Sequence, residues 1–129
     1  MTTTPIDISA TIDGLDFLPN RTPALGETAL NWATELSTYR DGGIFAVHYA
    51  GESEWERHPV GDEVVMVIDG STTMTILVDD VEHQHTLGPM GMVVVPQNTW
   101  HRFSTPEGVK VMTVTPQPTD HQVEHPSGG

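Results

Sequence analysis

The sequence predicts an all-β domain, either a sandwich or a small barrel. Helical periodicity of apolar residues is nearly absent, and short runs rich in Val, Ile, Thr and aromatic residues recur along the chain. Gly, Pro and Asp separate these runs at short intervals, a spacing typical of closed or two-layered β structures. At 129 residues, the chain has the length of one domain.

Each expected strand is a run of this kind that ends at a turn signal. In chain order, strands are expected at residues 29–38, 43–50, 54–58, 63–68, 72–78, 83–87, 92–95, 101–103 and 109–114. The turns fall where Gly, Pro and Asp gather, at residues 41–43, 59–62, 69–70, 79–80, 88–89 and 106–108. The last of these turns separates the final two strands.

The two ends of the chain differ from its middle. Residues 1–27 are polar with scattered Pro and Gly, and we expect an N-terminal extension that packs on the domain or on a partner. Residues 28–116 are expected to form the domain itself. Residues 117–129 contain too little apolar surface to offset the entropy of ordering, so a flexible C-terminal tail is expected.

The charge of the chain argues against two classes of partner. With 18 Asp and Glu against 5 Lys and Arg, the formal net charge is -13, which repels nucleic acid phosphates and anionic lipid headgroups. We therefore expect no nucleic acid and no membrane partner, and we interpret the acidity as a source of solubility. The chain has no cysteine, which excludes disulfides and thiolate chemistry. It has no signal-peptide pattern and no apolar run of membrane-spanning length, so a cytoplasmic protein is expected.

One expected strand, with the sequence EVVMVI, is apolar on both faces. Because side chains alternate across a strand, Val65 and Val67 share one face, and the other face carries Val64, Met66 and Ile68. A two-sided apolar strand fits a layered structure in which the N-terminal segment or a second subunit covers the outer face. A homodimer is therefore expected.

The stretch EWERHPVGDE places charged side chains directly before this strand. In an extended segment, Glu56 and His58 project on one side and present an oxygen and a nitrogen to the same point. A tight turn at residues 59–62 then reverses the chain and can return Glu63 beside His58. Two interpretations are open at this point: a chelating group, or the solvated acidic edge of a strand.

A second stretch, GMVVVPQNTWHRF, favours the chelating interpretation. It consists of a buried strand that Pro96 ends, a turn, and His101 at the head of the next strand. Asn98 suits a left-handed backbone within that turn.

With both motifs in this order, the sequence resembles the cupin family, in its small, single-domain, type-2 form. The first cupin motif is a glycine, then H-x-H, four residues, Glu, six residues and Gly. It is matched by Gly51, Glu56-x-His58, Glu63 and Gly70. The second motif is matched by Gly91, Pro96, Asn98 and His101, with a β-run one residue shorter than the common form. The resemblance covers about residues 41–115.

The resemblance implies a double-stranded β-helix, a jelly-roll barrel with a metal ion inside. His58, Glu63 and His101 occupy the positions of cupin metal ligands, and Glu56 stands where the family usually has a histidine. The implied metal ligands are therefore Glu56, His58, Glu63 and His101, although Glu56 is alternatively a general base. A sulfur-free set of nitrogen and oxygen ligands suits Fe(II), Mn(II), Ni(II) or Zn(II).

The activity that the resemblance implies is broad. One class is a metal-dependent enzyme acting on a small organic molecule, by dioxygenase-like chemistry or by lyase or isomerase chemistry. The alternatives are a non-catalytic cupin that binds or senses a small molecule, and a metal-independent, epimerase-like cupin. The fold alone does not separate these classes.

The remaining histidines are interpreted as less informative. His83 and His85 follow a turn in a polar segment and are expected in an exposed hairpin. His48 is expected in the core rather than lining a cavity. His121 and His125 lie in the expected tail.

Overall fold

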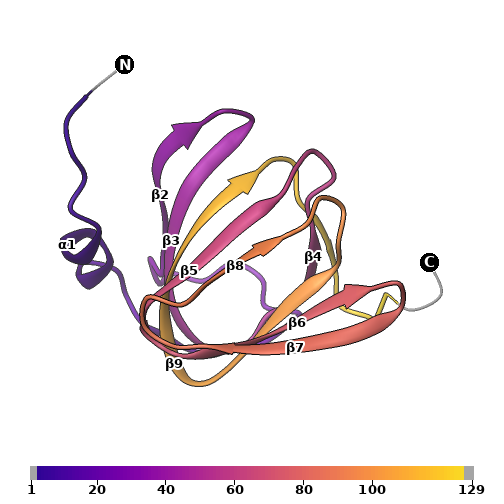
Figure 1. Cartoon of the computed structure of the whole chain (residues 1–129). Coiled ribbons are helices and arrows are strands. Elements are labelled where there is room, and N and C mark those ends of the chain that lie inside the picture. The colour runs from indigo at the N-terminus through magenta and orange to yellow at the C-terminus, as the bar shows by residue number, and fades with distance from the viewer. Residues whose placement is uncertain (1–2, 127–129) are drawn as a thin grey trace.

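Long antiparallel strands build most of the structure, a computed structural model that describes residues 3–126 (Figure 1). In chain order, the strands are β1 (Leu18–Arg21), β2 (Ala33–Tyr39), β3 (Gly42–Glu52), β4 (Trp55–Arg57), β5 (Glu63–Gly70), β6 (Thr72–Val78), β7 (Val81–Leu87), β8 (Met92–Val95), β9 (His101–Pro116) and β10 (Asp120–Gln122). One helix, α1 (Ile8–Asp13), precedes them. The predicted all-β fold class is confirmed.

Strand β9 is the centre of the topology. One of its edges pairs with β3, and the other edge pairs first with β6 and then with β5. β2 and β8 extend the sheet beyond β3 and β5, and β7 extends the sheet beyond β6. The result is a jelly roll built from one continuous folded sheet, in which β9 has strands on both of its edges (Figure 1). Within residues 3–126, the hydrogen-bonded strand order does not close into a ring.

Strands β6 and β8 have the predicted bounds, whereas the turn predicted at residues 106–108 is wrong because β9 continues through it. Tyr49 of β3 lies opposite Val109, and Gly51 lies opposite Thr105. The residues between these two pairs therefore form a bulge within the strand. Pro106 lies in this bulge. A proline is tolerated there because bulged residues make no backbone hydrogen bond to the neighbouring strand.

The core lies inside the folded sheet and contains the inward face of the two-sided strand. Val65 and Val67 of β5 are fully buried, where they pack with Met74, Phe103 and Val111 from the neighbouring strands. Burying side chains of this size stabilises the fold by roughly 1.5–3 kcal/mol each, before the cost of ordering them. The core therefore fixes the strands that hold the charged residues discussed below.

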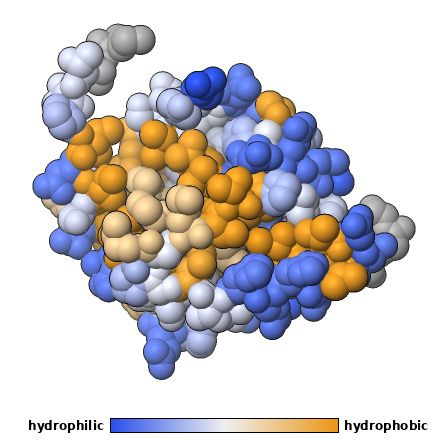
Figure 2. Space-filling model, in the orientation of Figure 1, coloured by the Kyte–Doolittle hydropathy of each residue, from blue (hydrophilic) through white to orange (hydrophobic). Residues whose placement is uncertain are grey.

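The opposite face of the same sheet is apolar and partly exposed. Val64 lies opposite Val94, and Met66 lies opposite Met92, so apolar side chains continue from β5 onto β8. Val94 and Met92 are 47% and 58% exposed. Figure 2 shows apolar side chains gathered over this part of the molecule. A continuous apolar surface of this kind is typical of an interface.

We propose that a second copy of the chain covers this face and that the protein is a homodimer. Val94→Lys would place a charge in the apolar interface, and it is expected to shift the protein from dimer to monomer at micromolar concentration. Light scattering checks the mass. Val81→Lys, at a 55% exposed position on β7, is the control and is expected to stay dimeric. A wild type that is monomeric at this concentration would contradict the proposal.

The N-terminal segment packs on the domain and contributes to its core. β1 pairs in parallel with β3, and Leu18 belongs to the hydrophobic cluster. Ile12 of α1 is fully buried, and Asp7 caps this helix by accepting a hydrogen bond from the backbone N–H of Ala10. No helix within residues 3–126 is long and apolar enough to cross a membrane.

Residues 117–126 do not form the flexible tail that their composition suggests. Strand β10 pairs antiparallel with β4, where Asp120 lies opposite Arg57 and accepts a hydrogen bond of 2.8 Å from its Nη2. The expectation considered only the apolar content of the segment, whereas polar contacts with the domain order it. Residues 127–129 of the expected tail lie outside the described residues.

Candidate metal centre

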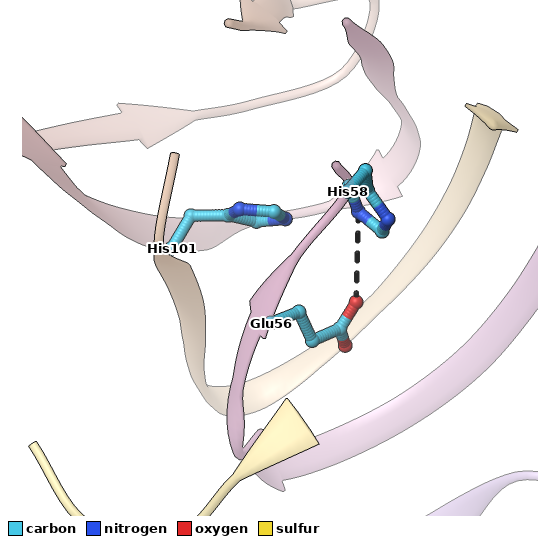
Figure 3. A group of neighbouring side chains, drawn as sticks. All are labelled: Glu56, His58 and His101. Atoms are coloured by element: carbon cyan, nitrogen blue, oxygen red, sulfur yellow. Dashed lines mark ion pairs between the residues drawn. The ribbon is translucent and has the colours of Figure 1, made fainter. Parts of the chain in front are cut away.

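Four side chains from the two sequence motifs meet inside the barrel. Glu56 lies in β4, His58 directly follows that strand, and His101 begins β9 (Figure 3). Glu56 and His101 are direct partners in the β4–β9 pair. The turn at residues 59–62 reverses the chain so that Glu63, the first residue of β5, returns beside His58. This local geometry is the one that strand alternation and the turn predicted.

The ligand atoms of these side chains lie close together and away from solvent. Oε1 of Glu63 lies 3.0 Å from Nε2 of His101 and 3.2 Å from Nε2 of His58. Oε2 of Glu56 lies 4.0 Å from Nε2 of His58. One ligand atom each from Glu56, His58 and His101 can be chosen so that all three lie within 4.8 Å of one another. His58, Glu63 and His101 are buried, and Glu56 is partly buried.

Hydrogen bonding at the far side of its ring fixes the tautomer of His101. Its Nδ1 lies 2.9 Å from the backbone carbonyl of Thr99, and a carbonyl oxygen only accepts, so Nδ1 carries a hydrogen. In the neutral ring, Nε2 then presents its lone pair to the carboxylate of Glu63 at 3.0 Å. Two facing acceptors repel each other, so this arrangement requires a proton or a metal cation between them.

The same reasoning applies to His58, whose supporting residues come from the C-terminal segment. The hydroxyl of Thr119 donates to Oε1 of Gln117, so its lone pair accepts the hydrogen of His58 Nδ1 at 3.0 Å. This leaves the lone pair of Nε2 free. Nε2 is a buried atom without a hydrogen-bond partner, because its contact with Glu63 lacks hydrogen-bond geometry. A buried, unpartnered nitrogen is costly unless a ligand satisfies it.

The carboxylates of Glu56 and Glu63 have opposite pKa shifts. Burial raises the pKa of Glu56, and the neighbouring charge of Glu63 raises it further. Burial acts in the same direction on Glu63, but interactions with His101 and His58 outweigh it and lower the pKa of Glu63 to about 2. Burial alone would lower the pKa of His101, but the hydrogen bond and the charge of Glu63 raise it. Glu63 is therefore ionised, and Glu56 is the carboxyl that more readily holds a proton.

The separations fit a transition-metal ion. Two ligand atoms that are each about 2.1 Å from an ion are roughly 3.0 Å apart at a right angle and roughly 4.2 Å apart on opposite sides. The observed separations of 3.0, 3.2 and 4.0 Å fall within this range. The set contains imidazole nitrogens and carboxylate oxygens, and a chain without cysteine offers no thiolate.

Thr119 is expected to support metal binding through the tautomer of His58. Thr119→Val removes the acceptor for the Nδ1 hydrogen, and it is expected to weaken divalent-metal affinity by about 10- to 100-fold, the usual effect of losing such a partner. Thr119→Ser keeps the hydroxyl and is expected to bind as the wild type does. Competition titration with a chromogenic chelator measures both variants. Equal affinity in Thr119→Val and wild type would show that Thr119 has no such role.

Comparison with known proteins identifies the family. The model of the family described as the cupin domain matches residues 43–126, which is more than half of the chain. The chain belongs to the cupin family. The predicted jelly-roll architecture and the resemblance inferred from the two motifs are thereby confirmed.

Solved structures with the same fold include enzymes and an uncharacterised protein. A conserved protein of unknown function from Streptococcus pyogenes is 16% identical, with a TM-score of 0.62, and the alignment covers 92% of this chain and 90% of that one. A cupin-2 domain protein from Shewanella frigidimarina is 24% identical, with a TM-score of 0.52 and coverage of 70% and 79%.

An oxalate oxidase in complex with glycolate is 18% identical, with a TM-score of 0.51, and the alignment covers 55% of this chain and 39% of the oxidase chain. A hydroquinone 1,2-dioxygenase in complex with Cd²⁺ is 16% identical, with a TM-score of 0.56 and coverage of 65% and 63%. At these identities, the likeness concerns the fold. No curated protein matches the sequence.

A cavity of about 440 Å³ lies beside the ligand cluster of this cupin and includes Glu56 and Glu63 in its wall. Most of the other lining side chains are apolar or aromatic, among them Phe45, Phe103 and Val111. A largely apolar cavity with a few convergent polar groups is the usual form of a small-molecule site. Of the charged residues in the stretch EWERHPVGDE, Glu56 and Glu63 therefore face this cavity.

The sequence alone did not reveal three residues of this site. Arg21 and Thr119 line the cavity, although they come from the expected extension and the expected tail. His121, also from the expected tail, pairs with Glu54 at 2.8 Å and lies near Glu56. No motif marks these positions. In the sequence, these residues are distinguished only as polar side chains in the two ends of the chain that were expected to lie outside the domain.

The remaining histidines lie apart from the centre. His83 and His85 are exposed on β7, as expected. His125 pairs with Glu82 at 3.0 Å and is likewise exposed. His48 is only partly buried and lines a second cavity, where its ring contacts Phe17 with a centroid separation of 4.8 Å. The expected core position of His48 is therefore not found.

Proposed function

We propose that this cupin is a metal-dependent enzyme that acts on a small organic molecule. Its divalent transition ion would be held by Glu56, His58, Glu63 and His101. The observation that carries this proposal is the convergence of two imidazole Nε2 atoms on a buried carboxylate, one of them without any hydrogen-bond partner. Hydrogen bonds from the two Nδ1 atoms orient both rings for metal binding, as expected of metal-ligating histidines.

A bound ion would supply Lewis-acid chemistry toward a substrate oxygen or, in the case of Fe(II), redox chemistry. The chain itself supplies position and proton transfer. Thr115 donates a hydrogen bond of 2.6 Å to Oε2 of Glu63 and so fixes that carboxylate. Glu56 borders the cavity, and in the alternative in which it does not bind the ion, its raised pKa makes it the stronger base of the two carboxylates. The apolar lining limits competing reactions with water.

The fold neighbours support an enzyme, and they leave the reaction class open. An oxidase of oxalate and a dioxygenase of hydroquinone share this fold, and by analogy with them we place dioxygenase-like chemistry on a small oxygen-rich or aromatic substrate first. Lyase or isomerase chemistry is the second class that this set of side chains supports, because a Glu56 that does not bind the ion can move a proton beside a Lewis acid.

Reconstitution with metal tests the proposed function. Metal-free protein is loaded anaerobically with Fe(II), Mn(II), Ni(II) or Zn(II), and diketones, catechols and hydroxy acids are added as substrates. Elemental analysis measures metal content, and oxygen uptake and product analysis measure turnover. We expect about one ion per chain and turnover with at least one metal. Stoichiometric metal without turnover would favour a binding or sensor cupin. Absence of stoichiometric metal would contradict the proposal.

A further inference from the structure

Arg21 brings a largely buried positive charge to the cavity. The chain has only five Lys and Arg residues, and Arg21 is the one that lines this cavity. Its side chain is 14% exposed. The buried, unpartnered side-chain nitrogens among residues 3–126 do not include those of Arg21, so its donors open onto the cavity and can reach a ligand there.

The partners that the protein itself provides satisfy only part of this side chain. Among residues 3–126, its polar partners are the hydroxyl of Tyr49 and the carboxylate of Glu56. Nη2 lies 3.8 Å from Oε1 of Glu56, which is too far for a hydrogen bond. A guanidinium has five N–H donors, so most of them remain available to a molecule in the cavity.

Two aromatic rings and a glycine fix the position of Arg21. Its guanidinium carbon lies 4.9 Å from the ring centre of Trp32 and 4.8 Å from that of Tyr49. The backbone of Arg21 pairs with Gly51, whose φ is +118°. A Cβ on Gly51 would lie 2.2 Å from the carbonyl oxygen of Arg21, so only glycine permits this close approach. Gly51 therefore helps to deliver Arg21 to the site.

Glu56 places Arg21 next to the ligand cluster. Oε1 of Glu56 faces Arg21, and Oε2 of the same carboxylate faces His58. An ion bound by two carboxylates is formally neutral, so it attracts an anion weakly, and the chain as a whole is strongly negative. A substrate anion thus needs a local positive charge, and Arg21 supplies one.

We infer that Arg21 binds the carboxylate or enolate group of the ligand, so that this site takes a small organic anion with an apolar body. The apolar body would pack against the aromatic and aliphatic part of the lining, which includes Phe45, Val47 and Phe103. A planar guanidinium pairs with a carboxylate through two parallel hydrogen bonds, which gives both affinity and orientation. This inference deepens the proposed function and rests on it for the chemistry that follows binding.

Matched acid and amide probes test the inference. Fluorine NMR measures binding of para-fluorobenzoate and para-fluorophenylacetate, each against its neutral amide, to wild type in the metal-free and Zn(II)-loaded states. We expect each acid to bind about tenfold or more tightly than its amide in both states. Arg21→Met is expected to lose this preference, and Arg21→Lys to keep part of it. Arg40→Met removes an exposed arginine from outside the cavity and is expected to leave the preference unchanged.

Three results would overturn the inference. Wild type that binds acids no better than amides, or binds neither, rules out an anion site. A preference that survives in Arg21→Met assigns the anion to another group. A preference seen only in the Zn(II)-loaded state assigns it to the metal. The measurement on metal-free protein needs no ion, so it still tests the role of Arg21 if the protein proves not to bind a metal. Conversely, metal content is measured separately, so it still tests the proposed metal centre if Arg21 proves not to bind the anion. The comparison within wild type does not depend on the folding of any variant.

Discussion

Replacing His101 or His58 with glutamine is expected to abolish stoichiometric binding of a divalent transition ion. Each substitution removes one of two imidazole nitrogens that face the carboxylate of Glu63 at 3.0 and 3.2 Å. Losing a residue that only supports a ligand already costs about 10- to 100-fold in metal affinity, so losing the ligand itself is expected to cost more than about a hundredfold. Elemental analysis after dialysis against micromolar metal measures the occupancy.

Glutamine is preferred to alanine because it preserves more of the buried volume and can still donate a hydrogen bond to Glu63. Alanine would leave a cavity and an unpaired buried carboxylate, and the protein could unfold for that reason alone. His83→Gln, on the exposed face of β7, is the matched control and is expected to retain full occupancy. Circular dichroism verifies that each variant is folded. Equal metal content in wild type and in both ligand variants would contradict the proposed centre.

Glu56 is expected to act as a metal ligand, and its substitutions separate this role from that of a base. As a ligand, Glu56→Gln should weaken metal binding, because a neutral amide replaces a carboxylate. Glu56→His should keep the metal and retain some activity, since it restores the usual cupin set of side chains. Both expectations follow from the position of Glu56 opposite His101 and on the same side as His58. Calorimetric titration with Zn(II) and elemental analysis measure the effect.

A general base gives a different pattern in the same two variants. Glu56→Gln would then keep full metal occupancy and lose turnover by about a hundredfold or more, the usual contribution of a positioned base. The raised pKa of Glu56 is compatible with this alternative, since burial and Glu63 both favour its protonated form. Unchanged metal content together with unchanged turnover would rule out both roles, and Glu56 would then be a charged residue in the cavity wall.

The ligand cluster was predictable because most of its geometry is local. Glu56 and His58 share a face because side chains alternate along an extended chain, and the turn that follows returns Glu63 within a few residues. The left-handed backbone predicted for Asn98 is confirmed, with φ of 59°, for a similar reason: the preference belongs to the residue and its turn. Only the proximity of His101 to Glu56, His58 and Glu63 was predicted from the family resemblance, through the order and spacing of the two motifs.

The supporting residues were not predictable, because their order depends on contacts between distant parts of the chain. Thr119 reaches His58 across 61 positions, and Asp120 reaches Arg57 across 63 positions. A composition rule sees only that the segment itself is polar, and so it predicted a flexible tail. The segment is ordered by its hydrogen bonds to other parts of the chain, and an estimate from the composition of the segment alone does not include those contacts.

The sequence by itself determined the all-β class, most strand positions and the residues of the candidate metal centre. These features depend on strand alternation, turn preferences and motif spacing, which act over a few residues at a time. The tertiary structure alone decided that β9 continues through residues 106–108, that residues 117–119 and 121 line the cavity, and that Arg21 lines it as well. Those features depend on which distant strands pair and on how closely their backbones approach each other, as Arg21 and Gly51 do. No local pattern in these segments contains that information.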